Sequence, residues 1–314
     1  MKKIYAFVLL LLPIFGLAQQ GVQFSQYMFN KIYYNPGVTG SGGAICVNLL
    51  NRNQWVGFEG APVTQNFNVN APIKVLHGGL GLSVTNDQIG FFKNIDFGLN
   101  YAYQMDLASG TLGIGLGLNL KNNSLDGAIW KPSENDFSDP SLPSGTTSNL
   151  TFDPSFGVYF ESREFWAGVS MANVLASNSV FDPFSGSNVV NFNNARHYYI
   201  MGGYNWRLPS SNWVIMPSTL IKTDLNSSPG VDVNIMGTYN NKMWGGVTYR
   251  LQDAVAVNLG YQILPSVKLG YSYDVGTSSL SSQGDGSHEV MLSYCFKIVI
   301  PVDPPGSNRN IRFL

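Results

Sequence analysis

Residues 111–121, Thr-Leu-Gly-Ile-Gly-Leu-Gly-Leu-Asn-Leu-Lys, decide the fold of this chain. Leucine or isoleucine occupies every even position, whereas glycine, asparagine or lysine occupies the odd positions from 113 onward. Successive side chains of a β-strand point to opposite faces, so this alternation predicts a strand with one apolar face and one small or polar face. The same alternation recurs in 254–262 and 266–275. We therefore expect an all-β protein.

Runs of this kind continue along the chain and predict fourteen strands. Their expected ranges are 44–51, 63–71, 78–86, 94–107, 111–121, 152–161, 164–173, 196–207, 212–223, 230–239, 242–250, 254–262, 266–275 and 287–298. Connections after odd-numbered strands average about 13 residues and those after even-numbered strands about 3, an asymmetry typical of outer-membrane barrels. Backbone polar groups in hydrocarbon must all pair within the protein, which requires a closed sheet. The sequence thus predicts a 14-stranded antiparallel transmembrane outer-membrane β-barrel, with apolar rows toward lipid and polar rows toward the lumen.

The composition supports this fold and excludes several functions. The chain has 314 residues, of which 12% are charged, and its formal net charge is −1. Soluble globular proteins carry about 25% charged residues, so a soluble sandwich of fourteen such strands would be unusual. Nucleic-acid binding requires an excess of basic residues, which this chain lacks. No segment after the first eighteen residues is long and apolar enough for a membrane-spanning helix.

The chain divides into four expected regions. Residues 1–18 have two lysines, a short apolar stretch and a terminal Ala18, which indicates a signal peptide cleaved before Gln19. Residues 19–43 are rich in aromatic side chains, and we expect this N-terminal segment to line the periplasmic mouth or to fold into the lumen. Residues 44–298 form the barrel, and residues 299–314 form a proline-containing periplasmic tail. The even number of strands places both termini in the periplasm.

The two cysteines, Cys46 and Cys295, lie on the first and last predicted strands. These strands are neighbours if the barrel closes, and both cysteines fall on the inward row near the periplasmic end. The periplasm permits disulfides. A bridge also requires the two Cα atoms to lie within about 7 Å. The strand register therefore decides between a disulfide and two free thiols.

Few residues of the sequence could form a catalytic site. Ser287, His288 and Asp285 include the residue types of a hydrolase triad. Neighbouring residues of a strand point to opposite faces, however, so Ser287 and His288 are poorly placed to share a proton. The alternating glycines of 111–121 continue as a strand and do not turn into a helix, as a dinucleotide-binding loop would. We expect no enzyme activity, no cofactor and no metal site.

Arg52, Asn53, Gln54 and Trp55 follow the first predicted strand and begin the first outer loop. Arginine and tryptophan are frequent anchors of protein interfaces. They are also ordinary residues at the level of the lipid head groups. Partner contact and structural anchoring thus remain two interpretations of this group. The long loops at 122–151 and 174–195 have little charge and are expected to offer a protein-contact surface.

A series of short motifs runs in order from the N-terminal segment to the last strand. The N-terminal segment contributes Phe24, Ser25, Gln26, Tyr27, Asn30, Asn35 and Pro36. Later motifs are Arg52-Asn53-Gln54-Trp55-Val56-Gly57, Asp87-Gln88-Ile89-Gly90, Arg196-His197-Tyr198-Tyr199, Met216-Pro217-Ser218, Tyr249-Arg250, Gly270-Tyr271-Ser272-Tyr273-Asp274 and Gly286-Ser287-His288-Glu289. In this ordered set the chain resembles the PorP/SprF family of the type IX secretion system of Bacteroidota.

The resemblance implies a non-enzymatic outer-membrane protein that serves type IX secretion or gliding motility. Such a protein supports export or surface attachment of a specific secreted cargo. The implied partners are that cargo or the C-terminal domain of a surface adhesin, periplasmic and outer-membrane components of the secretion machinery, and outer-membrane lipid. The alternative function is a general diffusion porin or small-solute channel. An open lumen would favour the channel, and an occluded lumen would favour the secretion component.

Overall fold

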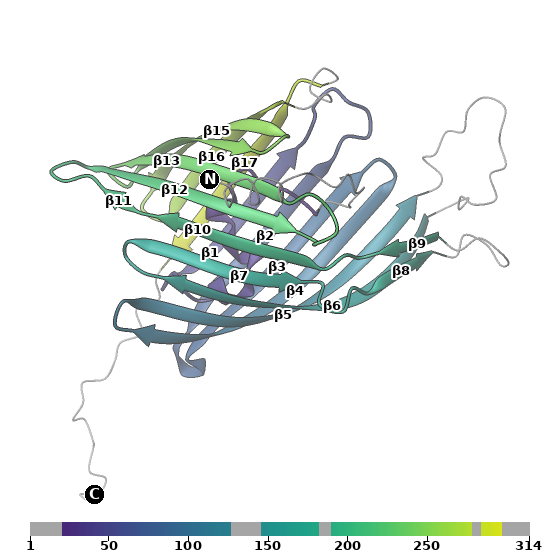
Figure 1. The fold of residues 1–314 in the computed structure, drawn as a ribbon, viewed down its shortest axis with the longest axis horizontal. Coiled ribbons are helices and arrows are strands. Elements are labelled where there is room, and N and C mark those ends of the chain that lie inside the picture. The colour runs from purple at the N-terminus through teal and green to yellow at the C-terminus, as the bar shows by residue number, and fades with distance from the viewer. Residues whose placement is uncertain (1–20, 127–145, 182–189, 278–283, 297–314) are drawn as a thin grey trace, which may run out of the picture.

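The computed structural model describes residues 21–126, 146–181, 190–277 and 284–296. Within these ranges, fourteen antiparallel strands form a closed barrel (Figure 1). The wall strands are β1 (Ile45–Asn53), β2 (Val63–Ile73), β3 (Gly78–Ile89), β4 (Phe92–Leu107), β5 (Gly110–Asp126), β6 (Thr146–Glu161), β7 (Phe165–Ala172), β10 (His197–Tyr204), β12 (Trp213–Thr223), β13 (Gly230–Tyr239), β14 (Met243–Arg250), β15 (Ala254–Leu264), β16 (Val267–Gly276) and β17 (Ser287–Phe296). The predicted fold and strand number are confirmed.

Two pairings complete the circle of strands. β1 pairs with β17 from Ile45 opposite Phe296 to Asn53 opposite His288. On the other side of the barrel, β10 pairs with β12 as well as with β7. Every wall strand therefore has two neighbours, as a closed sheet requires.

Side chains alternate across the wall as the sequence predicts. In β5, Leu116 is 59% exposed on the outer face, while the neighbouring Gly115 and Gly117 are buried on the inner face. One row of cross-strand neighbours on the outer face consists entirely of apolar side chains: Leu292, Leu49, Phe67, Val84, Phe97, Leu120 and Phe152. The apolar side chains thus face outward, which suits lipid and is the reverse of a soluble sandwich.

The structure differs from the prediction around the eighth strand. The predicted strand 196–207 is divided into β10 and the short β11 (Trp206–Arg207), which pair in turn with β12. The interruption lies opposite Pro217, and a proline lacks the N–H group that the ladder would use. Between β7 and β10, a separate hairpin of β8 (Asn178–Phe181) and β9 (Val190–Asn193) was not predicted.

Of the described segment before β1, residues 24–40 lie inside the barrel. They contain three short helices, η2 (Tyr27–Phe29), α2 (Lys31–Tyr34) and η3 (Pro36–Val38). We call residues 24–40 the plug. A fourth short helix, η4 (Lys74–Leu76), forms the turn between β2 and β3. In the described part of the chain, no helix has the length and apolar character to cross a membrane.

The buried apolar core consists of plug residues packed on inward wall residues. The plug contributes Phe24, Tyr27, Met28, Tyr34 and Val38, and the wall contributes Leu50, Tyr159, Trp166, Tyr199, Met201, Leu220, Met236, Trp244 and Met291. The wall residues come from eight different strands, so the plug contacts the barrel on many sides. Residues 24–40 thus lie in the lumen, whereas residues 19 and 20 of the predicted N-terminal segment lie outside the described residues. We call the barrel mouth at the turns β2–β3, β4–β5 and β6–β7 the short-turn end, and the opposite mouth the long-loop end.

Candidate functional site

A cluster of charged side chains lies inside the barrel near the long-loop end. We call it the charge cluster: Arg52, Lys222, Asp232, Arg250, Asp274 and Glu289. These residues come from β1, β12, β13, β14, β16 and β17, each within a few residues of the long-loop end of its strand. They project inward because they lie on the same alternate positions as the other lumen residues.

Each charge of this cluster has a partner of opposite sign. Arg52 Nη2 lies 2.8 Å from Asp274 Oδ2, and Arg52 Nη1 lies 3.3 Å from Glu289 Oε2. Arg250 Nε lies 3.1 Å from Asp232 Oδ1, while Lys222 Nζ lies 2.9 Å from Asp232 Oδ2. Arg250 Nη1 also lies 3.5 Å from Asp274 Oδ2, which connects the two groups. Such pairing is required because an isolated buried charge costs several kcal/mol or more.

The first residues of the plug bind directly to this cluster. The backbone N–H groups of Ser25 and Gln26 donate to the two carboxylate oxygens of Glu289, over 2.8 and 2.9 Å. The Ser25 hydroxyl donates to Asp274 Oδ2 over 2.6 Å and accepts from Arg52 over 2.9 Å and from Arg250 over 3.2 Å. The wall thus recognises both the backbone and the side chain of Ser25.

Amide side chains hold the middle of the plug. Asn30 Nδ2 donates to Asn66 Oδ1 over 3.1 Å, and Asn68 Nδ2 donates to Asn30 Oδ1 over 2.7 Å. On the opposite wall, the hydroxyl groups of Tyr27 and Ser218 lie 2.8 Å apart. The inward asparagine and serine rows of the strands therefore serve as hydrogen-bond partners for the plug and do not simply line open space.

Asn35 anchors the turn of the plug at η3. Its Oδ1 accepts from the N–H of Gly37 over 2.8 Å, and its Nδ2 donates to the carbonyl groups of Val158 and Val169 over 3.0 and 3.2 Å. One asparagine side chain therefore caps a turn within the plug and fastens that turn to two wall strands.

Glycines on the wall make room for the same turn. A Cβ atom at Gly115 would overlap the carbonyl carbon of Pro36 and the amide nitrogen of Gly37, and a Cβ at Gly113 would overlap the carbonyl oxygen of Gly37. The alternating glycines of 111–121 thus admit the backbone of η3 against the wall. No larger residue fits these positions without moving one of the two backbones.

Two tryptophans of the wall contact the plug near the short-turn end. The Nζ atom of Lys31 lies 3.9 Å from the ring centroid of Trp166, and the Phe29 ring centroid lies 5.1 Å from that of Trp244. Lys31 Nζ also donates to the hydroxyl of Tyr159 over 2.9 Å. Lys31 is thus held against the wall by a cation–π contact and a hydrogen bond.

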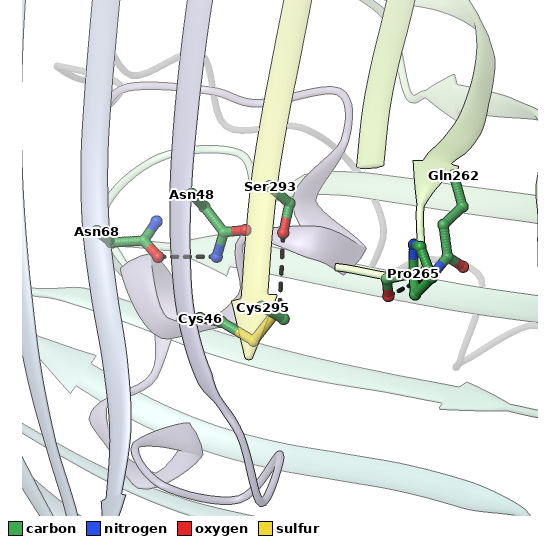
Figure 2. Close-up of a disulfide and its surroundings, with 7 residues drawn as sticks. All are labelled: Cys46, Asn48, Asn68, Gln262, Pro265, Ser293 and Cys295. Carbon is green, nitrogen blue, oxygen red and sulfur yellow. Dashed lines mark hydrogen bonds between the residues drawn. A yellow bond between two sulfur atoms is a disulfide. The ribbon is translucent and has the colours of Figure 1, made fainter. Parts of the chain in front are cut away.

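The two cysteines lie directly opposite each other on β1 and β17, with a Cα–Cα distance of 4.1 Å. The structure joins Cys46 and Cys295 by a disulfide (Figure 2). Figure 2 also shows the adjacent inward asparagines, where Asn48 Nδ2 donates to Asn68 Oδ1 over 3.0 Å. The disulfide lies at the short-turn end, where the chain leaves the plug and enters β1.

The four residues predicted to begin the first outer loop lie in different environments in the structure. Arg52 is still part of β1, is only 2% exposed and pairs with two carboxylates inside the lumen, so the prediction that it offers a surface contact is wrong. Arg52 lies two residues after the buried Leu50, so its side chain points to the same, inward face of β1. Asn53 is exposed, and Gln54 and Trp55 are half-buried. These three residues remain candidates for partner contact.

The loop that begins at Trp55 is fixed by the start of β17. The N–H of Trp55 donates to Ser287 Oγ over 3.1 Å, and the N–H of Val56 donates to the carbonyl of Gly286 over 2.8 Å. Trp55 itself adopts a φ of 47°, which is uncommon for a residue with a side chain. The loop thus presents its exposed side chains, including Phe58, from a defined backbone.

Ser287 and His288 point to opposite faces of β17. Ser287 is buried inside and binds the Trp55 backbone, whereas Nδ1 of His288 lies 2.6 Å from the Tyr271 hydroxyl on the outer face. This pair therefore cannot share a proton. Within residues 21–126, 146–181, 190–277 and 284–296, no group of three or more His, Cys, Asp or Glu side chains is arranged to hold a metal ion.

The sequence analysis did not identify most of the charge cluster. Alternation already placed Asp274 on an inward row, and the same rule applied to Asp232, Arg250 and Glu289 would have placed them inside. A charged residue on an inward row near a long loop was thus the available signal. The pairing between these residues depends on the register of the strands, which alternation does not provide.

Comparison with known proteins identifies a family. A family model described as type IX secretion system membrane protein PorP/SprF matches residues 16–294. No curated protein matches the sequence. Among solved structures, outer membrane protein Omp33 of Acinetobacter baumannii has 9% identity and a TM-score of 0.45, with 82% of this chain and 100% of that chain covered.

Two further solved structures have similar values. The CymD monoaromatic hydrocarbon channel has 9% identity and a TM-score of 0.46, with 86% of this chain and 99% of that chain covered. CdiB from Acinetobacter baumannii has 10% identity and a TM-score of 0.47, with 81% of this chain and 60% of that chain covered. With TM-scores below 0.5, these likenesses carry no conclusion about this chain.

Proposed function

Because this chain belongs to the PorP/SprF family of type IX secretion membrane proteins, we propose that it is a non-conducting outer-membrane component of that system. It supports export or surface attachment of a specific secreted cargo and contacts the secretion machinery. In this proposal the long loops face the outside and the short turns face the periplasm, as in other outer-membrane barrels.

The occupied lumen is the observation that supports this proposal over the channel. A diffusion porin keeps a polar, water-filled interior. Here the inward polar rows bind the plug, and the plug residues Ser25, Gln26, Asn30 and Asn35 are all fully buried. A solute would have to displace this segment from many contacts in order to pass.

The outer surface is the place for cargo in this proposal. Asn53, Gln54 and Trp55 lie next to the exposed Val56 and Phe58 on a loop fixed by β17. A rigid loop with a few apolar side chains loses little entropy on binding, which favours a protein partner. The loop has little charge, so its affinity should depend only weakly on salt.

The first experiment measures ion conductance of the purified barrel in planar bilayers, beside a reference porin in the same membranes. We expect no steady conductance from the wild-type protein. Steady, large conductance of the wild-type protein would favour the porin and contradict the proposal.

The second experiment tests the role in secretion. Deletion of the gene is expected to remove one or a few secreted proteins from the cell surface while other type IX substrates are still exported. A Trp55→Ala variant should reproduce part of that loss, whereas a Val75→Ala variant in the β2–β3 turn should not. An unchanged set of surface proteins after deletion would contradict the proposed role.

A further inference from the structure

The direction of the plug through the barrel follows from its contacts. Ser25 and Gln26 bind Asp274 and Glu289, each of which lies two residues from the long-loop end of its strand. Just before them, a Cβ atom at Gly21 would lie 3.9 Å from both His197 Nε2 and the Tyr199 hydroxyl, at the long-loop end of β10. The plug therefore begins close to the long-loop end.

The last residues of the plug lie at the other end of the barrel. The N–H of Gly40 donates to Asn70 Oδ1 over 2.7 Å, and Gly40 packs on Gly79, the second residue of β3. Gln104 Nε2 donates to the carbonyl of Thr39 over 2.6 Å from the end of β4 that leads into a short turn. The chain then enters β1 at Ile45, also at the short-turn end. The plug thus passes through the lumen from one mouth to the other.

We infer that this arrangement places Gly21, ahead of the plug, at the cell surface, whereas the end of β17 faces the periplasm. The inference rests on the proposed orientation of the barrel. Where two periplasmic termini were predicted, it puts the first and the last described residues, Gly21 and Phe296, on opposite sides of the membrane. Residues 21–23 then join the long loops in the outer surface, and Gly21 is exposed there.

Thiol labelling of intact cells tests this inference. Single cysteines are introduced as Gly21→Cys, Phe58→Cys in the β1–β2 loop and Val75→Cys in the β2–β3 turn. Phe58 is 48% exposed and Val75 is 87% exposed, so both positions are accessible from their own side. The probe is a maleimide that does not cross the outer membrane, and the wild-type protein gives the background from the native cysteines.

We expect labelling of the Gly21→Cys variant to follow that of the outer loop. The Gly21→Cys and Phe58→Cys variants should react in intact cells, and Val75→Cys only after the outer membrane is permeabilised. A Phe24→Cys variant is the matched buried control, since Phe24 is fully buried, and should react only after unfolding.

The outcomes separate the inference from the orientation on which it rests. If Gly21→Cys reacts only after permeabilisation while Phe58→Cys reacts in intact cells, the orientation stands and the inference is wrong. Reaction of Gly21→Cys only after unfolding would also overturn the inference. If Val75→Cys reacts in intact cells and Phe58→Cys does not, the proposed orientation itself is wrong.

Discussion

Arg52 on β1 and Asp274 on β16 form a 2.8 Å ion pair on the inner face of the barrel, although β17 lies between their strands. The same two residues both hydrogen-bond to the hydroxyl of Ser25. The pair therefore connects the wall of the barrel to the segment inside it. This relationship makes the charge cluster part of the binding site for the plug and not only an element of wall stability.

Removal of Arg52 should destabilise the barrel strongly. An Arg52→Ala variant leaves the buried carboxylates of Asp274 and Glu289 without one partner, a change that typically costs about 3–5 kcal/mol. We expect a loss of that size in the free energy of unfolding, measured by urea titration of the protein in lipid vesicles with tryptophan fluorescence. Arg163→Ala, at an exposed arginine in the β6–β7 turn, is the matched control. Equal stability of the two variants would contradict the structural role of the charge cluster.

Addition of a methyl group at Gly115 should displace the plug. A Cβ atom there overlaps backbone atoms of Pro36 and Gly37, which cannot rotate away as a side chain could. Overpacking of this kind costs about 1–3 kcal/mol. Gly115→Ala should lower the unfolding temperature and make the peptide bond after Lys31 susceptible to trypsin. Gly42→Ala is the control, because a Cβ atom at Gly42 has no neighbour within 4 Å. Trypsin resistance equal to that of the control would show that the position of the plug does not depend on the missing side chain at Gly115.

The oxidised state of Cys46 and Cys295 can be measured directly. The register places the two residues opposite each other, and the oxidising periplasm allows their thiols to pair. We expect the unfolded wild-type protein to migrate differently on reducing and non-reducing gels, and Cys46→Ser to remove that difference. Identical migration of the wild-type protein under both conditions would show that the thiols are free in the cell.

A charge on the outer face should be costly only where that face contacts hydrocarbon. Leu116 lies on the outward row of β5, and an arginine near the bilayer midplane of a barrel costs about 2–4 kcal/mol. Leu116→Arg should therefore reduce the free energy of unfolding in vesicles by up to about 4 kcal/mol. Phe58→Arg, on the loop, should leave it within about 0.5 kcal/mol of the wild-type value, as is usual for surface substitutions. Equal effects of the two substitutions would mean that the row of Leu116 does not face lipid.

Most of the wall could be predicted from the sequence because each strand carries its own signal. Alternation at 111–121 identifies β5 and its two faces without any knowledge of its neighbours. The signal weakened at the long-loop end of β5, where Asn122, Asn123, Ser124, Leu125 and Asp126 extend the strand without an alternating apolar row. It also failed opposite Pro217, where the predicted strand 196–207 is divided into β10 and β11, since the effect of a proline depends on which neighbouring strand it faces.

The candidate site was less predictable. Arg52 was assigned to a loop because the first strand was expected to end at Asn51, one residue before it. The burial of the N-terminal segment was expected only as one of two alternatives, since five aromatic rings could be covered at the mouth or in the lumen. The plug contacts themselves join residues far apart in the chain, such as Ser25 and Glu289, which are 264 positions apart.

By itself, the sequence determined the architecture of this protein: the strands, the side of each strand that meets lipid, and the closed sheet that a bilayer demands. These features follow from local alternation and from the need to pair every backbone group. The tertiary structure alone decided which inward residues meet, that Arg52 belongs to the lumen, and that the plug occupies it from end to end. Those contacts depend on the register of strands and on the path of a segment through a closed space, and neither is encoded in any single stretch of sequence.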